Sequence, residues 1–173
     1  MSGLALNNTV MTLPVGSNLG DNSSITIDAV APVIQSITSA TPNGTYGQSS
    51  NIDVTINFNE PVVLTGNLQV VLNSGGTVTV APFGPAISCS GTYVVGLGQS
   101  TGDLTVSPGG ISLASGTIRD QWGNDANLAI PATQNLGNNS NIVIDADGGT
   151  VTSITSTTAN GSYGAGQTID VVV

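Results

Sequence analysis

The sequence predicts an all-β fold, a β-sandwich that recurs along the chain. Short runs alternate apolar and polar residues with the period of two that strands show. Turn residues separate these runs about every 8–12 residues, which is the spacing of sandwich strands. No stretch has the apolar period of a helix, and Thr, Val, Ser, Asn and Gly dominate the composition.

The recurrence is visible as one long repeat. Residues 18–56 and 135–173 align without a gap at an offset of 117 residues, and 21 of the 39 aligned pairs are identical. A fixed period is the signature of a repeat array. One period is as long as a typical domain and can bury its own core. The array is therefore expected to consist of independent domains, unlike a solenoid of short repeats that share a core.

The repeat divides the chain into three parts. Residues 32–148 are expected to form one complete domain. Residues 1–31 correspond to the closing strands of a preceding copy, and residues 149–173 to the opening strands of a following one. We expect the chain to be either a window from a longer array or a subunit whose open ends are completed by a neighbour.

Within the complete copy the expected strands follow in order. Residues 33–39 form the first, and Pro42-Asn43-Gly44 is a turn. The clearest half-buried strand covers 52–58 and ends at Glu60-Pro61. Residues 68–72 and 78–80 form a hairpin around 73–76. The later strands are 87–95, with Cys89, Gly91 and Tyr93 on one face; 104–106 and 111–113, flanking the turn 108–110; and 142–145, after the loop 119–127.

The order of these motifs resembles a known family. The pattern includes Ile27-Asp28 to Pro32, Ile37-Thr38-Ser39, Asn43-Gly44 with Tyr46-Gly47, 52–63, 116–131 and 136–145. It looks like the tandem Ig-like, or cadherin-like, repeats of large bacterial surface, adhesin and matrix proteins. The likeness covers most of the chain except residues 64–115, and Asp147-Gly148-Gly149 stands where a second junction proline is expected. It implies an Ig-like sandwich in a tandem array, an extracellular or cell-surface location, and Ca²⁺ at loops and junctions.

The charge balance excludes several functions. The chain has ten acidic residues, no Lys, no His and only Arg119, for a net charge of −9. Nucleic acid is not an expected partner, because a single cation cannot displace the phosphate counterions of a nucleic acid. No window of about 18 apolar residues occurs, so membrane insertion is not expected. Met1-Ser2-Gly3 begins neither a basic segment nor an apolar one, so no signal peptide is expected in this sequence. A chain without His, Lys or a nucleophile motif is not expected to be an enzyme.

Surplus acid favours binding of a hard cation such as Ca²⁺, which takes six to eight oxygen ligands. The candidate ligands lie at copy ends and in one loop: Asp28, Glu60, Asp120, Asp125 and Asp145. No basic partner is expected to neutralise them. The alternative is that these Asp residues and their Asn neighbours make Asx-turns and loop caps. Their spacing matches neither an EF-hand nor a glycine-rich nonapeptide.

Two single residues have alternative interpretations. Trp122, the only Trp, is a candidate ligand-binding residue that stacks on a sugar; alternatively, its indole plugs one end of the sandwich or a junction, which we expect. Cys89, the only Cys, is expected to be a small buried apolar residue, because no basic neighbour activates its thiol. The five Asn-x-Ser/Thr sequons are too common in such a composition to indicate modification.

These features together predict a non-catalytic structural module, either a spacer or a fibre-forming subunit. The expected partner is the protein itself, through tandem packing or head-to-tail strand exchange, because Ile25, Ile27, Ile169 and Val171 would otherwise lie along open strand edges. The alternative is an adhesive module whose loops bind a glycan or a receptor.

Overall fold

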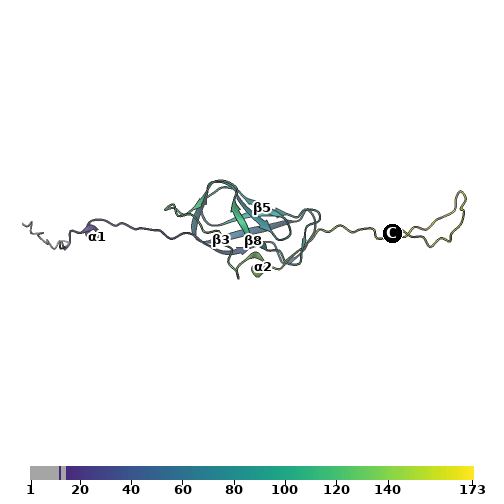
Figure 1. Ribbon diagram of the computed structural model, residues 1–173, viewed down its shortest axis with the longest axis horizontal. Helices are drawn as coiled ribbons and strands as arrows, with labels where there is room; N and C mark the ends of the chain where they lie inside the picture. Colours follow the sequence, from purple (N-terminus) through teal and green to yellow (C-terminus); the bar gives the residue numbers. More distant parts are fainter. Residues whose placement is uncertain (1–11, 13–14) are drawn as a thin grey trace, which may run out of the picture. The chain divides into compact units, whose positions relative to one another are not determined.

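The structure is a computed structural model that describes residues 12 and 15–173 (Figure 1). The chain divides into two units, residues 1–30 and 31–173. In the described part nearly all regular structure is strand, which confirms the all-β prediction. The closing strands are expected within residues 1–31, and residues 1–11 and 13–14 of that range lie outside the described residues.

The second unit contains three sheets. The first holds β1 (Ile34–Thr38), β3 (Asn51–Leu64) and β6 (Phe83–Val94), with β9 (Ile118–Arg119) paired to the far end of β3. The second holds β2 (Gly44–Tyr46), β10 (Ile142–Asp145) and β7 (Ser100–Thr101). The third holds β5 (Thr77–Val80), β4 (Leu68–Leu72) and β8 (Val106–Leu113). The pairings between these strands are antiparallel except that of β2 with β10, and an isolated bridge between Val33 and Asn127 is also parallel.

One apolar cluster lies between these sheets. The alternation in the first half of β3 buries Ile52, Val54, Ile56 and Phe58, as the sequence predicts. The predicted hairpin is confirmed as β4 and β5, which pair around residues 73–76. On β6 the predicted face is also confirmed, because Cys89 and Tyr93 are both buried.

The predicted end of β3 at Glu60-Pro61 is wrong. The strand continues through Pro61 to Leu64, and its register against β6 shifts between Asn57 and Val62. An irregularity of this kind accommodates a proline, which has no N–H for the ladder, without ending the strand. Beyond it, β3 pairs with β9. The bulge therefore sets the position of Glu60 relative to the residues that follow β9.

The predicted turn at 108–110 is also wrong. β8 runs continuously from Val106 to Leu113 and pairs with β4. Gly109 has a φ of +67°, which glycine adopts without strain, and the register shifts between Val70 and Leu72. A Cβ on Gly110 would lie 2.7 Å from the carbonyl oxygen of Val71. The glycines thus serve a bulge inside a strand, where the close approach of a neighbour excludes side chains.

Two kinds of element were not predicted. β2 follows directly on the Pro42–Asn43 turn and pairs in parallel with β10, which is almost 100 residues away. The two helices, α1 (Leu19–Asn22) and α2 (Leu136–Asn139), have four residues each. A single turn cannot show an apolar period, so its capping residues are its only sequence signal. No helix in the described residues is long enough to cross a membrane.

The local structure of the first opening strands recurs near the C-terminus. The bridge between Thr38 and Thr55 in the domain corresponds, 117 residues on, to the bridge between Thr155 and Val172. Three side-chain hydrogen bonds recur with it. Ser39 Oγ donates to Asp53 O, and Ser156 Oγ donates to Asp170 O, both at 2.6 Å. The N–H of Asp53 donates to Thr41 Oγ1 at 2.8 Å, and that of Asp170 donates to Thr158 Oγ1 at 2.9 Å. Tyr46 Oη donates to Pro42 O, and Tyr163 Oη donates to Ala159 O.

The closing segment recurs in the same way. Asn18 caps α1 and Asn135 caps α2, each with a capping box completed by the residue three positions on. The following residues differ in their structure. Residues 142–145 form β10, whereas residues 25–28 form no strand. The cap depends only on neighbouring residues, but a strand requires a partner strand.

Candidate functional site

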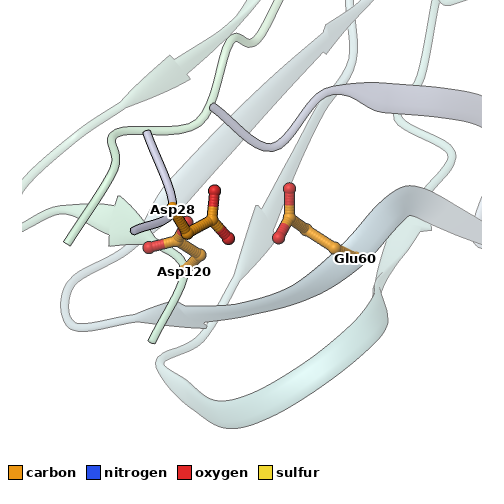
Figure 2. A group of neighbouring side chains, drawn as sticks. All are labelled: Asp28, Glu60 and Asp120. Carbon is orange, nitrogen blue, oxygen red and sulfur yellow. The ribbon is translucent and has the colours of Figure 1, made fainter. Parts of the chain in front are cut away.

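Two carboxylates of the candidate cation set lie together in the domain. Glu60 sits in the bulged part of β3, and Asp120 follows directly after β9, which pairs with Val63 and Leu64 of β3 just beyond the bulge. Their carboxylate oxygens lie within 4.8 Å of each other (Figure 2, which also labels Asp28 of the N-terminal unit). They border a pocket of about 210 Å³ lined by Glu60, Pro61, Val63, Pro85, Asp120 and Gln121.

Asp120 organises the loop that follows β9. Its side chain is only 6% exposed. Oδ1 accepts hydrogen bonds from the N–H groups of Trp122 at 2.8 Å and Asn124 at 2.9 Å, and Oδ2 accepts one from the Asn124 side chain at 2.7 Å. Burial alone raises the pKa of Asp120, but these hydrogen bonds, with a contribution from the Gly123 N–H, outweigh it and hold the pKa below its ordinary value. Asp120 is therefore ionised at neutral pH.

Asp125 has a partner that the sequence analysis missed. Arg119 Nε lies 2.6 Å from Asp125 Oδ1 and Nη2 lies 3.4 Å from Oδ2. The hydrogen bond from Arg119 lowers the pKa of Asp125, and the carboxylate raises the pKa of Arg119. The expectation that no basic residue neutralises the acidic set is thus wrong for Asp125. The available signal was that the only cation of the chain lies six residues before this Asp.

The other two candidates lie elsewhere. Asp145 is exposed at the end of β10, opposite Ser100 of β7. Asp28 belongs to the N-terminal unit, where its Oδ1 accepts a hydrogen bond from the N–H of Val30 at 3.0 Å. This contact is an Asx-turn of the kind that the alternative interpretation expects. Within the domain, the structure therefore brings together Glu60 and Asp120 but not Asp125 or Asp145.

The donor set of this pair fits a hard divalent cation. Two ionised carboxylates at this separation repel each other, and a cation between them removes the repulsion. Asp120 Oδ2 accepts a single hydrogen bond, which leaves one lone pair for an ion. Within the described residues, Glu60 makes no hydrogen bond or salt bridge. The pair supplies only part of the six to eight oxygens that Ca²⁺ takes, so water or further carboxylates must supply the rest.

Trp122 does not plug an end of the domain, whereas its expected alternative place at a junction stays a prediction. Its side chain is 57% exposed, although the preceding Asp120 is buried. The reason is local: Asp120 accepts the Trp122 N–H and folds the loop so that the indole projects outward. A fixed, exposed aromatic ring offers a flat apolar face that can stack on a sugar.

Cys89 is buried on β6, as predicted. Burial raises the pKa of its thiol to about 11, so the thiolate is scarce at neutral pH.

Comparison of the chain with protein-family models, curated proteins and solved structures finds no match.

Proposed function

We propose that this chain is a non-catalytic structural module of a bacterial extracellular surface protein, in which Ig-like domains follow one another as spacers or as subunits of a fibre. The observation that carries the proposal is the 117-residue recurrence. It appears in the sequence and again in the local hydrogen bonds of both chain ends. An array of similar domains with a single Arg, no Lys and no His is better suited to act as a spacer than to catalyse a reaction.

The pairing of β2 with β10 supports a load-bearing role. These strands lie near the two ends of the domain and run parallel, with Gly44 opposite Ile142 and Tyr46 opposite Ile144. Tension on the chain pulls β2 toward its N-terminus and β10 toward its C-terminus. Because the strands are parallel, this tension shears their hydrogen bonds together instead of opening them one by one.

Single-molecule extension tests this role. A domain pulled at its two ends should resist until it opens in one step, releasing a contour length of roughly 400 Å for about 117 residues. Handles at Asn67 and Ala81, the open ends of the β4–β5 hairpin, provide the control. Force applied there separates the paired residues of β4 and β5 one pair at a time. A lower opening force for the end-to-end direction than for the hairpin direction would contradict the load-bearing role.

Calcium is proposed to bind at Glu60 and Asp120 and to stabilise the start of the domain. Asn59 Oδ1 accepts a hydrogen bond from the N–H of Val33 at 2.7 Å, and Glu60 follows Asn59. An ion held by Glu60 and Asp120 would therefore lie close to the residues that open the domain. By the repeat offset, Asp28 and Asp145 hold equivalent places in successive copies.

Thermal unfolding with Ca²⁺ and with chelator tests this site. A bound ion stabilises the folded state by mass action, so the melting temperature should rise with Ca²⁺. Glu60→Gln should reduce the rise. Asp145→Asn is the control and should leave it unchanged, because Asp145 is exposed at the end of β10, opposite Ser100. An unchanged melting temperature at millimolar Ca²⁺ would remove calcium from the proposal.

The exposure of Trp122 favours a second candidate function, adhesion to a glycan. Because it is the only Trp, its fluorescence reports on this loop alone. Saccharide binding should change its emission in a saturable way, and Trp122→Ala should abolish binding measured by calorimetry. Emission that stays constant across a panel of saccharides would leave the spacer as the only proposed role.

A further inference from the structure

The opening and closing parts of the domain meet at a joint in which four hydrogen bonds add to the parallel pairing of β2 with β10. The closing segment is residues 134–145, containing α2 and β10, and the opening segment is residues 33–56. The bonds are Ile37 N to Gln134 O at 2.8 Å, Asn139 Nδ2 to Ile37 O at 2.9 Å, Gly44 N to Asn141 O at 3.1 Å and Asn141 N to Asn43 Oδ1 at 2.8 Å. Two of these bonds need a specific side chain, that of Asn139 and that of Asn43.

The same chain carries both halves of this joint a second time, on separate segments. At the repeat offset, Asn22 corresponds to Asn139 and Asn160 to Asn43, so both required side chains are conserved within the chain. The backbone partners correspond as well: Ser17 and Ser24 to Gln134 and Asn141, and Ile154 and Gly161 to Ile37 and Gly44. We call residues 17–27 the free closing segment and residues 151–173 the free opening segment.

Apolar side chains that the joint buries are exposed in the free segments. Ile37 is fully buried, whereas Ile154 is 69% exposed. Ile144 is 1% exposed, and its counterpart Ile27 is 87% exposed. Each free segment thus exposes apolar side chains whose counterparts in the domain are buried.

Both free segments already have part of their bound geometry. Asn22 Nδ2 donates to Asn18 O at 3.0 Å, as Asn139 Nδ2 donates to Asn135 O at 3.2 Å in the domain. The free opening segment has the Thr155–Val172 bridge and a φ of +88° at Gly166, where Ser49 has +69° in the domain. Because these turns form locally, binding need not order the segments from a random chain.

We propose that the free closing segment of one molecule binds the free opening segment of a second copy and re-forms the joint between chains. Asn22 Nδ2 donates to Ile154 O, Ser24 N donates to Asn160 Oδ1, and residues 25–27 form a parallel strand against residues 161–163. The inference rests on the fibre-forming form of the proposed function. Such a contact is heterologous and does not close, so it propagates head to tail.

A second copy is the occupant that the sequence favours. The two specific side chains are present at the required offset in every copy of the chain. Neither segment contains a basic residue, so neither is suited to an acidic partner of a different kind. The joint leaves two edges uncovered, because the domain also pairs the start of β3 with β6 and β10 with β7, and the two free segments contain no counterpart of β6 or β7. We therefore expect an association that depends on protein concentration.

Sedimentation of the full chain tests the proposal. The weight-average mass should rise with concentration above the 17.1 kDa of one chain. Ile27→Asp destroys the closing half of the joint, and Ile154→Asp destroys the opening half. Each variant alone should stay monomeric, because a buried carboxylate is costly. A mixture of the two should form dimers, because each still has one intact half. Thr152→Asp is the control and should assemble like wild type, since its counterpart Gln35 is exposed.

Three results would overturn the proposal. The first is a wild-type chain that stays monomeric at all concentrations. The second is an Ile27→Asp variant that still dimerises, which would indicate pairing between two opening segments. The third is a mixture of the two variants that stays monomeric. None of these results affects the mechanical opening force or the calcium response of a single chain, so the proposed spacer function would stand or fall separately.

Discussion

Truncation of Ile144 should destabilise the domain strongly, whereas truncation of Ile27, its counterpart in the free closing segment, should have almost no effect. Ile144 lies on β10 between β2 and β7 and is 1% exposed. Replacement by Ala removes three carbons, worth about 2.5 kcal/mol in transfer free energy, and leaves a cavity that adds about 1 kcal/mol. For about 117 residues the entropy of unfolding is roughly 0.25 kcal/mol/K, so the melting temperature should fall by about 14 °C.

The assay is urea and thermal unfolding followed by far-UV circular dichroism. Ile27→Ala is a closely matched control, because the substitution is chemically identical and sits in the same Ile-x-Ile-Asp context. Its side chain is 87% exposed, so its effect should lie within about 0.5 kcal/mol. Measurements belong at low protein concentration, where chains do not associate. Equal effects of the two substitutions, or none for Ile144→Ala, would refute the assignment of residues 134–145 as the segment that completes the core.

Three further predictions concern the domain. A fragment of residues 32–148 should fold cooperatively, with a melting temperature near that of the full chain in the presence of chelator; a disordered fragment would show that the domain limits are wrong. The free energy of unfolding should fall by about 2 kcal/mol between pH 9 and 11. The reason is that the folded state holds the Cys89 thiol protonated up to about pH 11, while the unfolded chain releases that proton near pH 9. In the Cys89→Ala variant this part of the decrease in the free energy of unfolding should be absent. The lowered pKa of Asp120 implies that its contribution is present above pH 3.8 and is lost as the pH falls through the lower folded value, so Trp122 emission should stay constant to below pH 3.8, and Asp120→Asn should change it at neutral pH.

The parts of the fold that the sequence predicted depend on contacts between near neighbours. The β4–β5 hairpin needs only alternation and a four-residue turn, and the face of β6 follows from a period of two. The caps of α1 and α2 are similarly local, but a four-residue helix has no period to find. In each case the residues that decide the structure lie within a few positions of one another.

The errors arose where a distant segment decides. Pro61 and the Pro108-Gly109-Gly110 stretch indicate turns when read alone, but β9 and β4 keep both strands going through a bulge. The candidate site depends on one distant pairing and on two local contacts. The pairing of β3 with β9 brings Glu60 near Asp120, and the capture of Asp125 by Arg119 removes it from the acidic set. The outward position of Trp122 follows from a hydrogen bond to a buried Asp that composition does not reveal.

The joint between β2 and β10 also has a consequence for folding. It connects the first part of the domain to the last, so it closes only after nearly the whole copy has been made, and such non-local pairing slows folding. In an array, the closing segment of one copy is followed at once by the opening segment of the next, and both joint-forming Asn side chains recur there. During folding, β10 therefore faces two nearly equivalent partners, its own β2 and that of the next copy. Pairing of β10 with the β2 of the next copy would be a domain swap within the array. The same similarity between copies that would let separate chains join head to tail also permits this swap.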